Sequence, residues 1–367
     1  MKKHTYDLLL IGAGLFNAII AREATKQGKK CLVIEKRNHI GGNLHNDLQA
    51  GINIHQYGAH IFHTNNQLIW NYMDNLCSFN HYINSPLAKY KDEIYNLPFN
   101  MNTFSRLWGL HTPQEVKNKI EEQRLKITNP ANFEEQALCL VGTDVYEKLI
   151  RGYTEKQWGV DAKLLPKFII NRIPIRFTYD NNYFDDVYQG IPQGGYNALF
   201  DKCFEGCDLY VNTDFFENKN IIHSAQKTVF SGMIDQYYDY CFGGLEYRSL
   251  HFEHEVLSTD NFQGNAVVNY TEREIPYTRI LEHKHFEFGE QLQTIITREY
   301  PQKWELGLEP YYPINTARNQ EKYVKYETLS QKESNVYFGG RLGSYKYYNM
   351  DQTVLAALEL FNSGRLD

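Results

Sequence analysis

Two short runs of branched apolar residues lie near the start of the chain, with a helical pattern between them. Residues 5–11 and 30–34 have the length and composition of buried strands. Gly12 and Gly14 stand at the turn from the first run into the helix, and Glu35 ends the second run. This order predicts a strand–helix–strand unit that binds a dinucleotide. The glycines permit a tight turn and close approach of backbone N–H groups to a pyrophosphate, and the acid accepts hydrogen bonds from ribose hydroxyls.

One position departs from this pattern. The third small residue of G-x-G-x-x-G/A falls where the chain has Asn17. A small residue there lets the helix pack closely on the strand. We expect Asn17 either to hold the helix slightly off the sheet or to bind the turn through its side chain. The next residue, Ala18, is small and partly compensates for the larger Asn17.

A second glycine pair, Gly41-Gly42, follows soon after Glu35. A nicotinamide dehydrogenase needs only the first glycine loop, whereas an extended FAD needs close backbone approach along its middle as well. The pair therefore favours FAD, although glycine pairs also mark ordinary surface turns.

The rest of the chain alternates between strand-like and helical stretches. Residues 103–149 have the pattern of several amphipathic helices, with Thr112 and Asn132 as N-caps, and alternating β patterns dominate from 245 to 300. We predict an α/β fold in which a Rossmann-like FAD-binding domain carries an inserted helical domain and an antiparallel β-sheet domain. The expected boundaries are 1–65, 190–245 and 330–367 for the FAD-binding domain, 100–165 for the helical domain with a mobile lid, and 66–99, 166–189 and 246–329 for the sheet domain that holds the substrate.

Length and charge narrow the class of protein. A chain of 367 residues is long enough for two or three domains. Its net charge of −6, without a basic stripe, argues against nucleic acid as a partner. Glycines end the first apolar run too early for a signal peptide, and no run approaches the ~18 residues of a membrane helix. We expect a soluble cytoplasmic protein with no membrane partner, whose six scattered cysteines stay reduced.

One aromatic segment is typical of a nucleotide site. Tyr153 and Trp158 lie between glycines 152 and 159, and Arg172 follows on a loop punctuated by prolines. Such residues can stack a base and clamp a phosphate. Alternatively, Trp158 anchors the helical stretch to its neighbour.

Two histidines, His60 and His63, lie in an apolar segment that we expect to cross the interior near the cofactor. No carboxylate or cysteine stands beside them in the sequence. A pocket-lining or hydrogen-bonded role is therefore favoured over a metal site, and we predict no metal.

The last helix has a clear start signal. Asn349 is a good N-cap, and Gln352 follows three residues later. The positive end of a helix that begins there would stabilise the anionic reduced ring of a flavin.

Taken together, these motifs resemble those of bacterial UDP-galactopyranose mutases along nearly the whole chain. The matching segments are Gly12-Ala13-Gly14, 40–43, 58–64, 152–159, 180–184, 276–279, 310–313 and 340–343. The resemblance implies a cytoplasmic homodimer that binds FAD and interconverts UDP-galactopyranose and UDP-galactofuranose for cell-surface polysaccharide. Two departures are Asn17, at the third glycine position, and Asn349, a position before the last helix where the family more often has Asp.

The resemblance also implies roles for particular residues. Catalytic roles fall to Arg172, Arg279, His60 and His63, with the two arginines on the phosphates of UDP. Substrate contacts fall to Asn84, Tyr153, Trp158, Arg172, Tyr183, Arg279, Tyr312 and Tyr347. Cofactor contacts fall to Gly12, Gly14, Leu15, Phe16, Glu35, Lys36, Gly42, Asn43, His60, Ile61, Arg341, Asn349 and Met350.

In that family the reaction passes through a reduced-FAD N5–sugar adduct with no net redox change, so FAD must be reduced, by NAD(P)H or another reductant. This agrees with the absence of a Ser/His/Asp set or a paired acid in the sequence. A flavin oxidoreductase acting on an amine or alcohol is the rival hypothesis, but it leaves the aromatic and arginine sets unexplained. A non-catalytic nucleotide-sugar binding protein is a third. The motifs do not distinguish a 2-hydroxyl from a 2-acetamido sugar.

Overall fold

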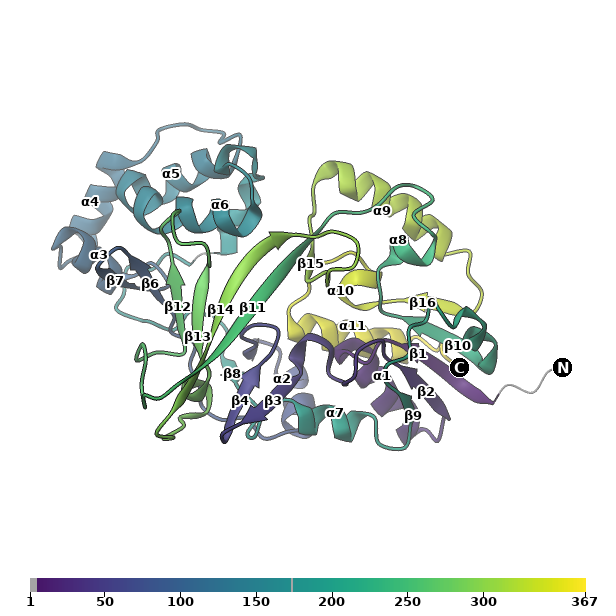
Figure 1. Ribbon diagram of the computed structural model, residues 1–367. Helices are drawn as coiled ribbons and strands as arrows, with labels where there is room; N and C mark the ends of the chain where they lie inside the picture. The colour runs from purple at the N-terminus through teal and green to yellow at the C-terminus, as the bar shows by residue number, and fades with distance from the viewer. Residues whose placement is uncertain (1–4, 173) are drawn as a thin grey trace.

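The computed structural model describes residues 5–172 and 174–367, apart from the side chains of residues 168, 171 and 172. Two sheets organise the molecule: a five-stranded one near both termini and a seven-stranded one, with a group of helices beyond the second (Figure 1). The predicted α/β fold is confirmed. Among the described residues, no helix is both long and apolar enough to cross a membrane.

The five-stranded sheet is parallel, and its strands β1 (Tyr6–Ile11) and β2 (Cys31–Ile34) are buried on both faces, which explains their continuous apolar runs. Leu8 and Leu10 face one core, and Leu9 and Ile11 face the other. The strand order is β16 (Val336–Phe338), β10 (Ala225–Phe230), β1 (Tyr6–Ile11), β2 (Cys31–Ile34) and β9 (Asp208–Tyr210). Helices α1 (Leu15–Lys26), α7 (Asn197–Cys203) and α11 (Met350–Asn362) contribute to the first core.

The seven-stranded sheet is antiparallel except where β12 runs parallel to β6. Its order is β15 (Tyr312–Pro313), β11 (Tyr247–Leu257), β14 (Thr294–Lys303), β13 (Arg279–Glu282), β12 (Val267–Tyr270), β6 (Leu87–Tyr90) and β7 (Glu93–Asn96). The long strands β11 and β14 cross the middle of the molecule, between the helical group and the parallel sheet (Figure 1). This sheet therefore connects the two ends of the molecule.

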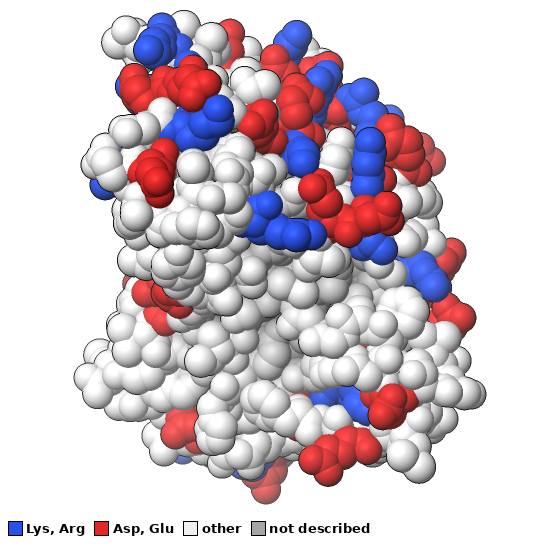
Figure 2. All heavy atoms as spheres, turned by 90° about the vertical axis from the view of Figure 1, so that its left-hand side faces the viewer, with Lys and Arg blue, Asp and Glu red and all other residues white. Residues whose placement is uncertain are grey.

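The helical group comprises α3 (Met101–Trp108), α4 (Pro113–Gln123), α5 (Phe133–Val145) and α6 (Gly152–Trp158) around a core of its own. Thr112 and Asn132 cap α4 and α5, as the sequence predicts, by accepting hydrogen bonds from the backbone N–H groups of Glu115 and Glu135. Charged side chains gather on the upper part of the surface in Figure 2, where these helices lie. The sequence pattern of capped amphipathic helices is thus confirmed.

The remaining strands and α-helices lie outside the two large sheets and the helical group. They are β3 (Asn46–Gln49), β4 (Ile52–His55), β5 (Phe62–Thr64), β8 (Tyr188–Gly190), α2 (Gln67–Asp74), α8 (Ile234–Tyr237), α9 (Ala317–Ser330) and α10 (Gly340–Gly343). β3 pairs with β4, and β5 pairs with β8. The segment between β4 and β5 carries His60 through the interior, as the sequence predicts.

Candidate functional site

Two cavities meet inside the molecule. The first, of about 600 Å³, lies at the carboxyl edge of the parallel sheet, and the second, of about 420 Å³, lies between the seven-stranded sheet and the helical group. Of the residues that the structure describes, five line both cavities: Asn43, His60, Tyr311, Arg341 and Met350. We call the place where these residues lie the junction.

The first cavity is built on the glycine turn after β1. Gly12 has a φ of +94°, and a Cβ atom there would lie 2.5 Å from Ser231 Oγ, so the turn requires glycine. A Cβ atom on Gly14 would meet no protein atom within 4 Å. Since Gly14 lines the cavity, its backbone is open to close approach by a ligand.

Asn17 binds this turn through its side chain. Its Nδ2 donates to the carbonyl oxygens of Ile11 and Gly12 at 2.9 and 2.8 Å, and to Ser231 Oγ at 3.2 Å. The residue is fully buried. Of the two expectations for this position, the structure therefore favours a side chain that ties the turn together.

The second glycine pair packs against the first. Gly41 and Gly42 have φ values of +95° and +55°, and the Gly41 N–H donates to the Ala13 carbonyl. A Cβ atom on Gly42 would lie 3.1 Å from the Cα atom of Gly14. The pair is thus part of the cavity wall rather than an ordinary surface turn.

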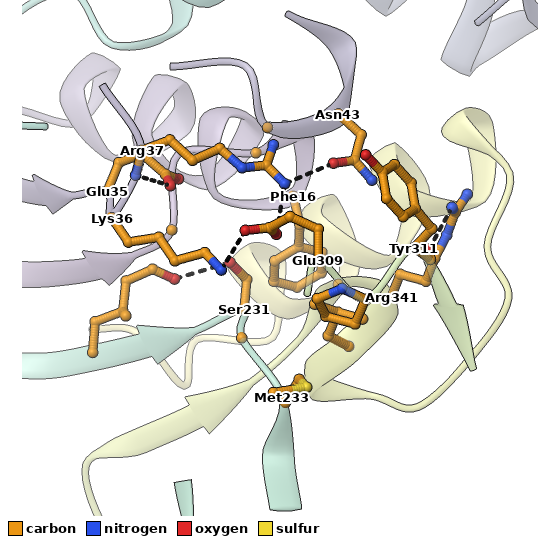
Figure 3. Close-up of a pocket in the computed structure, with 18 of the residues that line it drawn as sticks. Phe16, Glu35, Lys36, Arg37, Asn43, Ser231, Met233, Glu309, Tyr311 and Arg341 are labelled. Atoms are coloured by element: carbon orange, nitrogen blue, oxygen red, sulfur yellow. Dashed lines mark hydrogen bonds and ion pairs between the residues drawn. The ribbon is translucent and has the colours of Figure 1, made fainter. Parts of the chain in front are cut away.

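Acidic and basic side chains close one side of this cavity. Glu35 is buried at the end of β2, where its carboxylate accepts from the N–H groups of Ala13 and Arg37. Figure 3 shows the Glu309 carboxylate between the side chains of Lys36 and Arg37, at 2.7 and 2.8 Å. Burial alone would raise the pKa of Glu309, but Arg37 and Lys36 outweigh it and lower that pKa.

These features fit a dinucleotide such as FAD. The cavity has the volume of a cofactor site, two glycine pairs let backbone approach the ligand, and Glu35 stands where a ribose is bound in this fold. Arg37 lines the cavity, and its buried Nη1 has no hydrogen-bond partner among the described residues. An acceptor-rich ligand would satisfy that nitrogen.

His60 is the histidine at the junction. Its Nδ1 lies 2.8 Å from the Gly58 carbonyl oxygen, and because a carbonyl only accepts, Nδ1 carries the proton and Nε2 is left as an acceptor. Burial, with smaller effects of Arg341 and Arg279, lowers the pKa of His60 to about 4. The imidazole is therefore neutral at pH 7.

His63 has a partner that the sequence did not reveal. Its Nδ1 forms a hydrogen bond with the carboxylate of Asp186, and its ring stacks on Phe184 at 3.7 Å. Both groups come from the segment that precedes β8. Within the described residues, no three His, Cys, Asp or Glu side chains form a group that would hold a metal ion.

Arg279 lies in the second cavity beside two partners. Its Nε is 3.3 Å from Glu299 Oε1, and its Nη2 donates to the Tyr153 hydroxyl at 2.9 Å. Burial would lower the pKa of Arg279, but Glu299 and Tyr153 outweigh it and raise that pKa. Arg279 is thus a permanent positive charge on the wall of the second cavity.

Aromatic residues surround this charge. The ring of Trp158 meets Tyr312 edge to face at 6.2 Å, Tyr312 meets Tyr347 in the same way at 5.6 Å, and Arg341 lies over Tyr347 at 4.9 Å. Trp158 also packs against the core of the helical group. It therefore lines the cavity and joins the helical group to β15, so both expectations for this residue describe part of its position.

The structure brings most of the predicted site residues to these two cavities. Asn84 and Tyr183 line the second, and the buried Oδ1 of Asn84 has no hydrogen-bond partner among the described residues. Asn349 begins α11 as predicted, with its N–H donating to Gln352 Oε1, and it lines the second cavity rather than the first. Ile61 lines the second cavity as well, whereas the side chain of Arg172 lies outside the described residues.

Sequence reasoning missed three residues that hold the site. Glu299 holds Arg279, Asp186 holds His63, and Glu309 bridges Lys36 and Arg37. Each of the three is distant in the sequence from a residue that it holds, so no local motif signals it.

Comparisons with known proteins agree with this geometry. A family model described as UDP-galactopyranose mutase matches residues 148–347, more than half of the chain, and an NAD(P)-binding Rossmann-like domain matches residues 10–76. The fold and site thus define a nucleotide-binding enzyme of the mutase type. The chain belongs to the UDP-galactopyranose mutase family, whose enzymes are isomerases.

Two curated relatives are equally similar in sequence. A dTDP-fucopyranose mutase of Escherichia coli is 36% identical over 96% of this chain and 96% of its own length. A probable UDP-galactopyranose mutase of Klebsiella pneumoniae is 36% identical over 96% of this chain and 93% of its own length. The solved structure of a reduced UDP-galactopyranose mutase superimposes with a TM-score of 0.73 at 17% identity, covering 98% of this chain and 93% of that one. That likeness shows the shared fold.

Proposed function

We propose that this protein is an FAD-dependent UDP-galactopyranose mutase, which interconverts UDP-galactopyranose and UDP-galactofuranose with no net redox change. The observation that carries the proposal is the junction. A cavity that fits a dinucleotide opens there onto a second cavity that holds a fixed positive charge and a set of aromatic rings. A nucleoside diphosphate sugar in the second cavity would bring its anomeric carbon to the cofactor.

Reduced FAD, when bound, supplies a nucleophilic nitrogen, N5, for transient attachment of the sugar, and the other tasks fall to this chain. Arg279, held by Glu299 and Tyr153, neutralises the diphosphate as it leaves. Arg172 is assigned the opposite side of the diphosphate by family resemblance. A guanidinium suits this task because it stays charged and binds two oxygens at once.

The aromatic residues and the histidines orient the substrate. Trp158 and Tyr153 are assigned to the uridine, and Tyr183, Tyr312 and Tyr347 to the phosphates and sugar. His60 presents a neutral imidazole at the junction, where its Nε2 can accept a hydrogen bond from a sugar hydroxyl. Asn84 Oδ1, buried and without a partner among the described residues, is a second acceptor for such a hydroxyl.

The E. coli relative supports a second candidate, dTDP-fucopyranose mutase, because it matches the chain as well as the Klebsiella protein does. Its substrate differs in the base methyl group, the ribose 2′-hydroxyl and the sugar 6-hydroxyl. Both candidates need the same cofactor chemistry and the same diphosphate clamp, so they differ only in which nucleotide sugar is turned over.

The test compares four substrates with the reduced protein: UDP-galactopyranose, dTDP-galactopyranose, UDP-fucopyranose and dTDP-fucopyranose. Products are separated by chromatography and identified as furanoses by NMR. The highest kcat/KM with UDP-galactopyranose, no turnover in the oxidised state, and product in large excess over the electrons supplied would support the proposal. A preference for dTDP-fucopyranose would establish the second candidate. Stoichiometric oxidation of the sugar would refute both.

The setting of the reaction is part of the proposal. We infer a cytoplasmic homodimer that is reduced by NAD(P)H and supplies galactofuranose for cell-surface polysaccharide. These statements rest on family resemblance. Size measurement in solution and the rate of flavin reduction by NADH and NADPH test the assembly and the reductant.

A further inference from the structure

The backbone of His60 is held from behind by two buried side chains. The Tyr196 hydroxyl donates to the His60 carbonyl at 3.0 Å, and the His60 N–H donates to Nδ1 of His55 at 3.3 Å. Tyr196 is fully buried and His55 is 2% exposed. Both peptide groups of His60 therefore direct their hydrogen-bonding atoms toward the interior of the protein and away from the junction.

The direction of each hydrogen bond is determined. Burial raises the pKa of Tyr196 well above its usual range, so its hydroxyl stays a donor. Burial also lowers the pKa of His55 to about 3, which keeps its ring neutral. Because Nδ1 of His55 accepts from a backbone N–H, the ring proton is on Nε2.

His55 is held in turn by His283, directly after β13, and through His283 by Thr297 of strand β14. Its backbone N–H donates to Nδ1 of His283 at 3.2 Å, so His283 carries its proton on Nε2 and donates to Thr297 Oγ1. The His55 ring stacks on Phe286 at a centroid distance of 4.7 Å. The support behind His60 is therefore a connected set of buried side chains rather than a single contact, although the Nε2–H of His55 has no hydrogen-bond partner among the described residues.

We propose that Tyr196 and His55 are positioning residues, which hold the two peptide groups of His60 so that its imidazole, and not its backbone, faces the junction. Neither residue lines either cavity, so they act through His60 alone. Without these hydrogen bonds, the His60 peptides are free to turn and to place a carbonyl or an N–H beside the cofactor ring. Displacements of this kind, of about 1 Å, change rates by up to about 10²-fold.

Tyr196→Phe removes one hydroxyl and leaves the packing of the ring. The control is Tyr326→Phe, because Tyr326 is also fully buried and its hydroxyl donates to a backbone carbonyl, that of Gly243, at 2.9 Å. The same hydroxyl also accepts from the Phe242 N–H at 3.0 Å, so Tyr326→Phe should lose at least as much thermal stability as Tyr196→Phe. Only Tyr196→Phe should change the absorption spectrum and midpoint potential of the bound flavin, and only it should lower kcat, by about ten-fold, with KM within about two-fold.

His55 is tested with two variants of similar shape, one with a hydrogen-bond acceptor in its side chain and one without. His55→Asn keeps an acceptor near the position of Nδ1 and should retain most of the activity and the flavin spectrum. His55→Leu fills the space without an acceptor and should behave like Tyr196→Phe. Equal flavin spectra and equal kcat in Tyr196→Phe and Tyr326→Phe, or in the two His55 variants, would overturn the inference.

The inference rests on the proposed function for its kinetic measurement only. If the reduced wild-type protein turns over none of the four nucleotide sugars, the proposed function fails, and the flavin spectrum and potential still test the positioning role. If the wild-type protein is active and the Tyr196 and Tyr326 variants match in every measurement, the positioning role alone fails.

Discussion

Asn17 provides a direct test of how the cofactor turn is built. The change Asn17→Ala removes Nδ2, whose two hydrogens serve three acceptors: the carbonyls of Ile11 and Gly12 and the Ser231 hydroxyl. The Ile11 carbonyl keeps the Ser231 N–H and hydroxyl as donors at 3.1 and 2.9 Å, but no other donor to the Gly12 carbonyl exists among the described residues. The loss thus falls mainly on the Gly12 carbonyl, in the turn that approaches the cofactor.

The expected loss of stability follows from these hydrogen bonds. A partly buried carbonyl left without a donor costs about 1–3 kcal/mol. Alanine is a better helix former than Asn by roughly 0.5 kcal/mol, and the change also removes the buried, unpaired Oδ1 of Asn17. We therefore expect Asn17→Ala to lower the free energy of unfolding by about 1–2 kcal/mol and to weaken FAD binding by up to about ten-fold.

Asn17→Asp sharpens the test because it is nearly isosteric but, while ionised, cannot donate, so the comparison is made well above the pKa of the new carboxyl. Its carboxylate would face two carbonyl oxygens in a buried site, so it should destabilise more than Asn17→Ala. Thermal unfolding of the full-length protein with and without FAD, and fluorescence titration of FAD, measure both effects. An unchanged or raised stability in Asn17→Ala, or wild-type behaviour of Asn17→Asp, would refute the assignment of Asn17 as the donor that ties the turn.

Three further changes test the two cavities. Arg279→Ala should lower kcat/KM by about 10²-fold while FAD stays bound, because it removes a desolvated charge from the diphosphate. We expect the same of Arg172→Ala. Loss of FAD from either variant, seen in its absorbance spectrum, would show that the arginine binds the cofactor instead. Glu309→Gln should speed FAD release several-fold in a fluorescence assay and make the release rate less sensitive to salt, because it weakens the ion pairs of Glu309 with Lys36 and Arg37. The control is Glu305→Gln, a change at an exposed residue of the same loop. Equal FAD release rates in the two variants would contradict a role for these ion pairs. UDP should shift tryptophan emission in the wild-type protein and much less in Trp158→Phe, because Trp158 lines the second cavity; an equal response would exclude Trp158 from the nucleotide site.

Local patterns in the sequence were sufficient to predict the elements that depend on interactions between nearby residues. The strand–turn–helix at Gly12 and Gly14, the acid Glu35 at the end of β2, and the caps Thr112 and Asn132 each depend on residues within a few positions of one another. Hydrophobic period, φ freedom and capping act over that range, so they can be recognised without a fold. The departure at position 17 was also visible, and its two outcomes could be stated in advance.

Only the tertiary structure decided which polar groups meet. His63 and Asp186 are 123 positions apart, Tyr196 and His60 are 136 apart, and Arg37 and Glu309 are 272 apart. Closing such long loops costs conformational entropy, which the burial of apolar surface elsewhere in the molecule offsets. The residues next to each partner therefore need no particular pattern, and the sequence near them does not signal the pairing. Sequence patterns could therefore predict a dinucleotide site and an aromatic, arginine-bearing site, whereas the junction between them and the groups that hold it depend on how the two sheets pack.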